Sequence, residues 1–126
     1  MIQTEVLGTR LYVAGFALLG YRPPADMAWV LQQVVALVGM QTGGLEPKVW
    51  SYPLPDGAGG LGETICQPLV ESFIVSDAWP ELKVKGRKMR KTYVVMASCR
   101  QFNPQAVAAY LEKEVGKVWR LGLFEL

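Results

Sequence analysis

Two segments of helical character stand far apart in a chain whose other apolar segments favour β-strands, and this order limits the folds it can adopt. Residues 26–38 repeat apolar side chains at helical spacing, and the glycine that follows them is a typical stop. Residues 103–115 begin with Asn103 and Pro104, a good N-cap and a good first helical residue. Because only two glutamines give the first helix a polar side, we expect it to be mostly buried. Its expected apolar stripe is Trp29, Val30, Val34 and Leu37.

Six shorter segments are rich in β-branched and aromatic residues and predict strands. Asp56–Gly62, which is rich in glycine, predicts a flexible turn between two of them. Helices separated by runs of short strands are typical of an α+β two-layer sandwich, so we expect an antiparallel β-sheet with two helices packed on one face. The expected strands are residues 9–19, 48–54, 63–69, 72–76, 92–98 and 118–124.

The length and composition favour one globular domain over residues 1–126. Apolar residues make up 51% of the chain and charged residues 19%, which excludes intrinsic disorder. The longest apolar stretch, residues 28–40, contains two glutamines and falls short of the roughly 20 residues of a membrane span. Because the N-terminal residues show no signal-peptide pattern, we expect a cytoplasmic protein without membrane contact, with Cys66 and Cys99 reduced.

The chain contains no histidine, which excludes every site that needs an imidazole. Zinc sites with histidine ligands, Ser-His-Asp triads and imidazole bases are excluded together. Two cysteines are also too few for a zinc cage, so we expect no metal site. The glycine-rich turn lacks the lysine and the spacing of a P-loop, which argues against phosphate binding there.

One short stretch gathers much of the positive charge. Residues 82–91 hold six of the thirteen Lys and Arg residues and no acidic residue. We interpret this stretch first as a solvated loop between two strands, because no aromatic residues interleave the charges. The alternative is a basic hairpin over residues 83–91 that binds an acidic protein or a nucleic acid.

Several short motifs in the second half of the chain follow one another in a set order. Glu71-Ser72 precedes the run Asp77–Glu81, which reads Asp-Ala-Trp-Pro-Glu, and a later strand ends in Ser98-Cys99 before a helix that begins with proline. From residue 60 to residue 116 the chain resembles the small prokaryotic S-adenosylmethionine decarboxylases. That family has a Glu-Ser bond, a His-Thr-Trp-Pro-Glu run at the same spacing, and a strand ending in Thr-Cys. The basic stretch is an insertion in this pattern.

The resemblance implies a self-processing enzyme of polyamine biosynthesis that decarboxylates S-adenosylmethionine or a related amino acid. In that family the serine hydroxyl attacks the preceding peptide carbonyl to give an ester. Elimination then cleaves the chain and converts the serine into a pyruvoyl group. The pyruvoyl carbonyl forms a Schiff base with the substrate amine and accepts electrons as carbon dioxide leaves. Members of the family commonly form symmetric dimers, so the resemblance also implies a homo-oligomer, a homodimer.

The resemblance assigns a role to each matching position. Ser72 would be the pyruvoyl precursor, and Glu71 would become the new C-terminus. Cys99 would return a proton to the substrate carbon, and Glu81 would bind the ribose hydroxyls of the substrate. Thr64 stands where the family has a serine that assists processing, and its hydroxyl can serve in the same way.

Asp77 departs from the family pattern because it replaces the processing histidine. An imidazole has a pKa of about 6.5 and accepts a proton at neutral pH, whereas an ordinary aspartic acid, at about 3.9, gives a much weaker base. Processing therefore uses a carboxylate base, runs slowly, or has been lost. The glycine-rich loop before Thr64 also lacks the aromatic ring that the family uses to stack the adenine. The alternative is an unprocessed pseudoenzyme of the same fold, acting as a nucleoside-binding, regulatory or protein-interaction module.

Overall fold

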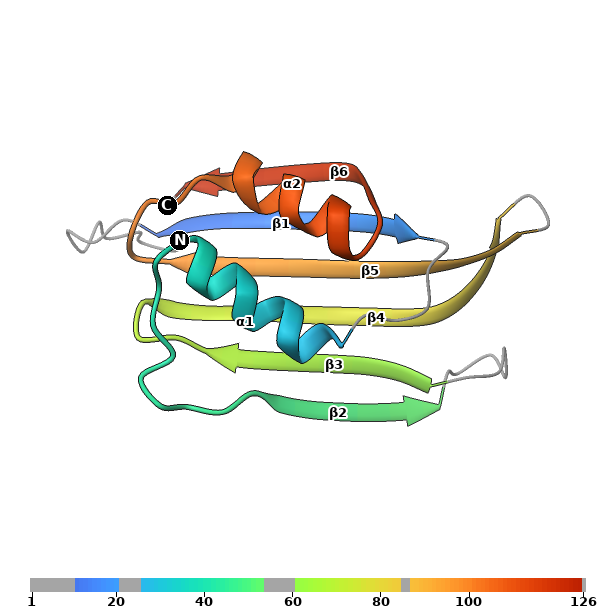
Figure 1. Cartoon of the computed structure of the whole chain (residues 1–126), viewed down its shortest axis with the longest axis horizontal. Helices are drawn as coiled ribbons and strands as arrows, with labels where there is room; N and C mark the ends of the chain where they lie inside the picture. The colour runs from blue at the N-terminus through green and yellow to red at the C-terminus, as the bar shows by residue number, and fades with distance from the viewer. Residues whose placement is uncertain (1–10, 21–25, 54–60, 85–86, 126) are drawn as a thin grey trace, which may run out of the picture.

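The structure is a computed structural model that describes residues 11–20, 26–53, 61–84 and 87–125. They form an α+β fold in which two helices pack against one six-stranded antiparallel open sheet (Figure 1), which confirms the expected class. Most of the expected glycine-rich turn, residues 56–60, lies outside the described residues. The elements are β1 (Tyr12–Gly20), α1 (Met27–Leu37), β2 (Lys48–Pro53), β3 (Leu61–Pro68), β4 (Ser72–Val84), β5 (Arg87–Ser98), α2 (Pro104–Glu114) and β6 (Lys117–Glu125).

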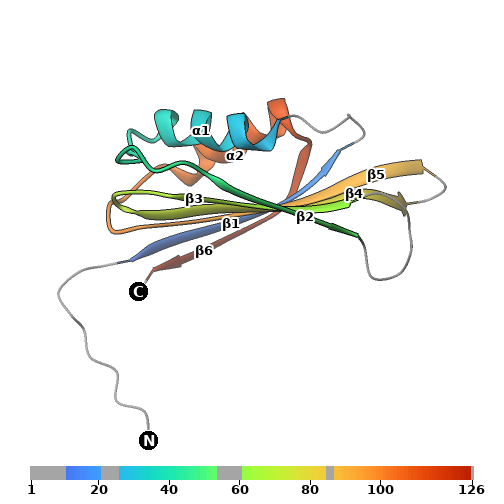
Figure 2. The ribbon, with the colours of Figure 1, turned by 90° about the horizontal axis from the view of Figure 1, so that it is seen from below.

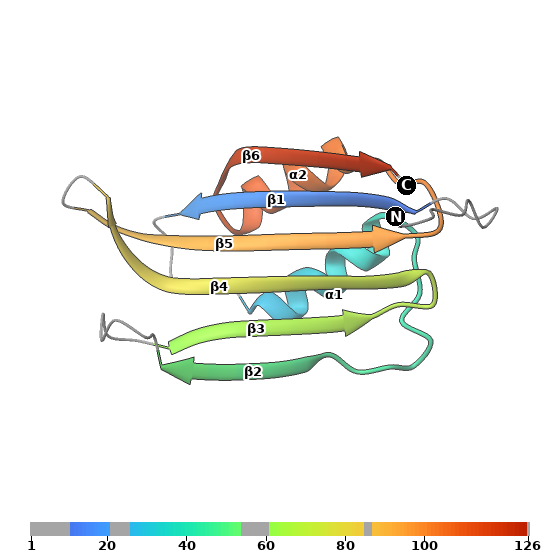
Figure 3. The same ribbon diagram turned by 180° about the vertical axis from the view of Figure 1, so that it is seen from behind.

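The strand order places β4 and β5 in the middle of the sheet. Along the sheet the strands follow the order β2-β3-β4-β5-β1-β6, and every neighbouring pair is antiparallel. α1 carries the chain from β1 to the far edge strand β2, and α2 carries it from β5 to the other edge strand β6. Both helices lie on the same side of the sheet (Figure 2). We call the other side, which Figure 3 shows without a covering layer, the open face.

Both helices begin at the expected caps. The Asp26 side chain accepts the Trp29 N–H at 3.2 Å, and the Asn103 side chain accepts the N–H groups of the second and third residues after it. The expected stripe of α1 was partly wrong, because Trp29 and Leu37 are 47% and 49% exposed. The sheet covers only one side of α1, and that side carries Met27, Val30, Leu31, Val34 and Val35. In the part of the chain that the structure describes, neither helix is long enough to cross a membrane.

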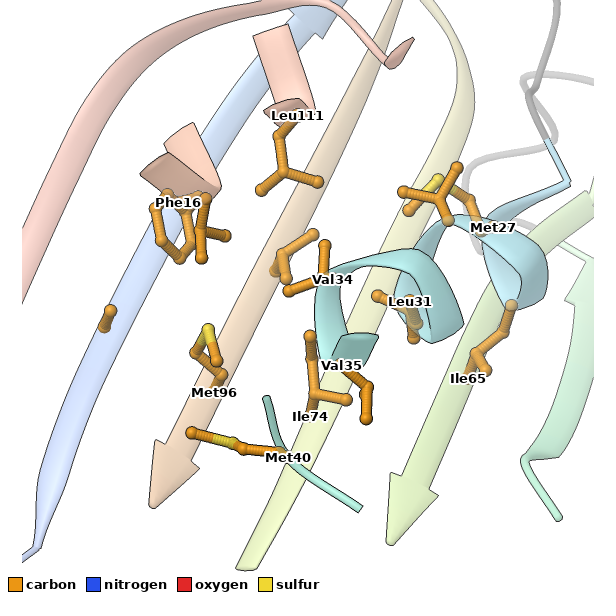
Figure 4. Packing of buried hydrophobic residues seen from close by; sticks show 14 of the residues in the cluster. Phe16, Met27, Leu31, Val34, Val35, Met40, Ile65, Ile74, Met96 and Leu111 are labelled. Carbon is orange, nitrogen blue, oxygen red and sulfur yellow. The ribbon is translucent and has the colours of Figure 1, made fainter. Parts of the chain in front are cut away.

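The hydrophobic core lies between the sheet and the two helices (Figure 4). Alternate residues of the strands supply its lower layer, because successive side chains of a strand point to opposite faces. The helix stripes supply the upper layer. The fully buried large side chains of the core are Phe16, Leu18, Val30, Leu31, Val34, Ile65, Ile74, Val94, Met96, Val107 and Leu111.

The hairpin of β4 and β5 extends beyond the other strands (Figure 1), so interpreting residues 82–91 as a loop was wrong. Both strands were expected to be shorter. Between Trp79 and Leu82 the register shifts, so that two residues of β4 stand opposite one of β5. Pro80 lies in this bulge, which is one of the few places where a strand tolerates proline. The side chains of residues 80–90 lie outside the described part, so a partner for the basic hairpin stays a prediction.

Candidate functional site

The Glu71–Ser72 bond lies in the turn that joins β3 to β4. The Leu69 N–H donates a hydrogen bond to the Ser72 carbonyl at 3.0 Å, which closes a tight turn over residues 69–72. We call this turn the hairpin tip. The strand pairing on either side continues up to the residues that flank it. The bond that the sequence predicts to be cleaved therefore belongs to a well-defined turn at one end of the sheet.

Gln41, which follows α1 in the chain, holds the hairpin tip from outside. Its carbonyl accepts the Val70 N–H at 2.9 Å, and its N–H donates to the Glu71 carboxylate at 3.2 Å. Both bonds use the backbone of Gln41. The Glu71 side chain is thereby tied to the loop after the helix by a solvent-exposed hydrogen bond.

Strand register places Cys99 next to the same bond. Ser72, the first residue of β4, pairs with Ser98, the last residue of β5. Cys99 follows directly, and its backbone N–H donates to the Glu71 carbonyl oxygen at 3.1 Å. That carbonyl is the group which a Ser72 hydroxyl would attack. A backbone N–H at this distance stabilises negative charge that develops on the oxygen.

Arg100 fixes the bend in which Cys99 lies. Its backbone N–H donates to the Ser98 hydroxyl at 2.9 Å, and its guanidinium donates to the Gly39 carbonyl at 3.2 Å, just after α1. Ser98 is fully buried, whereas the thiol of Cys99 is free and its residue is exposed. The bend is therefore attached to both layers of the fold and presents Cys99 toward solvent beside the hairpin tip.

Thr64 and Asp77 contact each other, and Tyr52 joins them. Thr64 stands opposite Asp77 in the pairing of β3 with β4. The Thr64 hydroxyl donates to Oδ1 of Asp77 at 3.2 Å, and the Tyr52 hydroxyl donates to the same oxygen at 2.9 Å. The two hydroxyl oxygens are 3.0 Å apart. We call these three half-buried side chains the hydroxyl–carboxylate cluster.

The cluster and the hairpin tip lie on different faces of the sheet. Ile74 and Ser76 of β4 are buried beneath the helices, so Asp77, which alternates with them, belongs to the open face. Ser72 stands two residues before the buried Ile74 on the same strand, so it belongs to the helix face. Asp77 is five residue steps along the strand from Ser72, which corresponds to roughly 16 Å. The structure brings the members of each group together but keeps the two groups apart within one copy.

Sequence reasoning missed three residues that shape these groups: Tyr52, Gln41 and Arg100. Tyr52 had a signal, because it stands two residues after Trp50 in an expected strand and so shares its face. Gln41 acts through its backbone, which no residue type reveals. Glu81 lies in the bulge of β4, and its side chain is outside the described part, so its ribose contact stays a prediction.

Neither a scan against protein-family models nor a search of curated proteins produced a match. Function is therefore inferred from the two groups of side chains and from the order of the motifs around them. Among the described residues, no three His, Cys, Asp or Glu side chains gather as ligands for a metal ion.

Proposed function

We propose that the chain is a self-processing, pyruvoyl-dependent decarboxylase that acts on S-adenosylmethionine or a related amino acid. The observation that carries this proposal is the hydrogen bond from the Cys99 N–H to the Glu71 carbonyl. It places a charge-stabilising donor on the one carbonyl that self-cleavage would attack, and it brings the thiol-bearing residue to the same bond. The motif order, including Trp79-Pro80-Glu81, supports the substrate class and the S-adenosylmethionine decarboxylase-like fold.

Self-cleavage at this bond follows from ordinary acyl-transfer chemistry. The Ser72 hydroxyl oxygen attacks the Glu71 carbonyl carbon, and the negative charge that develops on the oxygen is stabilised by the Cys99 N–H. The peptide C–N bond then breaks, and an ester joins Glu71 to the Ser72 side chain. A base removes the α-proton of Ser72, Glu71 leaves as a carboxylate, and hydrolysis releases ammonia and leaves a pyruvoyl group at position 72.

The residues beside position 72 fit such a group. The pyruvoyl carbonyl supplies an electron sink for decarboxylation. Cys99 is exposed next to this position and supplies a proton to the substrate carbon, which is a general-acid role. The Glu71 carboxylate, held by the Gln41 N–H, stays beside the site and offers an anionic partner for the substrate amine.

The cluster of Asp77 and Thr64 would act on Ser72 of a second copy. Within one copy the two groups lie on opposite faces of the sheet and roughly 16 Å apart along β4. Asp77 therefore reaches a Ser72 hydroxyl or α-proton only across an interface between copies. This agrees with the homodimer that the motif resemblance implies.

Purified protein should separate into two pieces on a denaturing gel after incubation at neutral pH. The expected pieces are residues 1–71 and 72–126, and the second should be lighter than the simple hydrolysis product by one ammonia molecule. Cyanoborohydride with S-adenosylmethionine should then add the substrate to the second piece only. A single intact chain of 13.9 kDa after long incubation, with no adduct, contradicts the proposal.

Mixing two inactive variants tests the role of the second copy. A Ser72→Ala chain keeps the cluster but has no cleavable serine, and an Asp77→Ala chain keeps the serine but lacks the carboxylate. After the two are unfolded and refolded together, we expect the Asp77→Ala chain to be cut, although neither variant is cut alone. Mass spectrometry identifies which chain is cleaved. A mixture that stays whole excludes action between copies.

An unprocessed protein of the same fold is the second candidate. It is favoured by the position of Asp77, which stands apart from Ser72 of its own copy. The Oδ1 of Asp77 also already accepts hydrogen bonds from two hydroxyl groups. In that case the chain binds a nucleoside without cleaving itself. Titration calorimetry with methylthioadenosine on an intact chain would then give a binding isotherm, and a flat trace contradicts this candidate.

A further inference from the structure

The ring of Tyr52 crosses over β3 to reach Asp77 on β4. Tyr52 belongs to β2 and stands opposite Gly62 of β3 in the strand pairing. A Cβ atom at Gly62 would lie 2.6 Å from Cε2 of the Tyr52 ring, closer than such atoms approach in proteins. The absence of a side chain at this position therefore leaves the space through which the ring extends. The small size of Gly62 therefore allows the Tyr52 hydroxyl to contact a carboxylate two strands away.

The hydroxyl–carboxylate cluster has three oxygen–oxygen contacts of hydrogen-bond length but only two hydroxyl protons to form hydrogen bonds. Its three oxygens are 2.9, 3.0 and 3.2 Å apart, and the contact between the two hydroxyls permits either one to donate. When Asp77 is ionised, Tyr52 and Thr64 contribute two protons, so only two of the three contacts are hydrogen bonds at one time. A proton added to Asp77 supplies the third bond. The cluster can thus accept one proton with rearrangement of two hydroxyl groups and no movement of the backbone.

We propose that Tyr52 is a positioning residue that fixes the Asp77 carboxylate and shares the proton which this carboxylate accepts during self-cleavage. The inference rests on the proposed function and adds to it a residue that the motifs do not contain. Tyr52 does not touch the reacting bond of its own copy. Its effect passes through Oδ1 of Asp77, which it holds together with Thr64.

The decisive comparison is Tyr52→Phe with Tyr93→Phe. Tyr93 is also half-buried on the open face and stands opposite Asp77 on β5, which makes it a matched control. We expect Tyr52→Phe to slow self-cleavage about 10- to 100-fold, the usual effect of losing a hydrogen bond to a charged group. Tyr93→Phe should stay within about twofold of the wild-type rate, since none of the hydrogen bonds within the cluster involves the Tyr93 hydroxyl.

Two further measurements separate positioning from a merely structural role. Thr64→Ser should restore the cleavage that Thr64→Val loses, because serine keeps the hydroxyl of the cluster. In intact chains that carry Ser72→Ala, the ¹³C signal of the Asp77 carboxyl carbon at pH 7 should shift when Tyr52→Phe is added, and stay in place when Tyr93→Phe is added. Because this signal is recorded on intact chains, it reports on the contact between Tyr52 and Asp77 independently of self-cleavage.

The possible failures are distinguishable. A wild-type chain that never cleaves contradicts the proposed function itself. Equal cleavage rates for the wild-type and Tyr52→Phe chains overturn the role of Tyr52 and leave the proposed function standing. Chemical denaturation must first show that both proteins are folded. An Asp77 signal that does not respond to Tyr52→Phe also overturns it.

Discussion

Replacing Ser72 by alanine is expected to leave the chain whole under conditions in which the proposed function requires the wild-type chain to be cut. Alanine has no hydroxyl to attack the Glu71 carbonyl and no side-chain oxygen on which an ester can form. The loss is total rather than partial, because both the attack and the later elimination use the same oxygen. A denaturing gel and the intact mass should show one species of 13.9 kDa at every time point.

Ser76→Ala is the matched control for this experiment. Ser76 belongs to the same strand and the same face as Ser72, is 1% exposed, and its hydroxyl has no hydrogen-bond partner within the described residues. Removing it should change the free energy of unfolding by no more than about 1 kcal/mol. The Ser76→Ala chain should be cut at the wild-type rate. Continued cleavage of Ser72→Ala at the same bond would show that position 72 does not supply the nucleophile.

Replacing Phe16 by alanine is expected to have the largest effect on stability. Phe16 lies on β1 beneath the helices and is 1% exposed, within the cluster of Figure 4. Truncating a buried phenylalanine removes transfer free energy and leaves a cavity, at a cost of about 3–5 kcal/mol. Because a typical domain is stable by only about 5–15 kcal/mol, this variant should lose a large part of its free energy of unfolding. Urea denaturation, followed by fluorescence, measures the change.

Phe73→Ala tests the same truncation on the opposite side of the sheet. Phe73 alternates with the buried Ile74 and is 39% exposed on the open face. Its loss should cost about 1 kcal/mol at low protein concentration, the typical size for a single substitution without a cavity. If a second copy covers the open face, this cost grows as the protein concentration is raised. Equal losses for Phe16 and Phe73 would contradict the placement of the core between sheet and helices.

Most of the fold could be predicted from local patterns. Asn103-Pro104 and Asp26 begin helices by cap chemistry that acts within one turn, and each of the six strands overlaps one of the expected apolar segments. The exposure of Trp29 and Leu37 could not be predicted, since helical spacing gives the period of a stripe but not which side meets the sheet. The extension of β4 and β5 through the basic residues was also missed, because hairpin pairing overrides the weak strand propensity of lysine and arginine.

The candidate site, like the fold, could be predicted from the sequence only in part. The motif order brought Glu71, Ser72 and Cys99 to attention, and strand register places them side by side. The separation of Asp77 from Ser72 follows from alternation along one strand, which a motif match ignores. Tyr52 escaped notice because its contact depends on the pairing of β2 with β3 and on a glycine in the facing strand, and neither is encoded near Tyr52 itself.

The hairpin tip has one more consequence for a chain that is cut there. From its first residue β4 is paired with β5, and from its second also with β3, so breaking the turn removes a covalent link but none of the ladder bonds of the sheet. The piece that contains β1, β2 and β3 lacks the two central strands, and the other piece lacks α1. Each is therefore an incomplete peptide, and together they form a non-covalent heterodimer in which residue 72 becomes a chain terminus held at the sheet border.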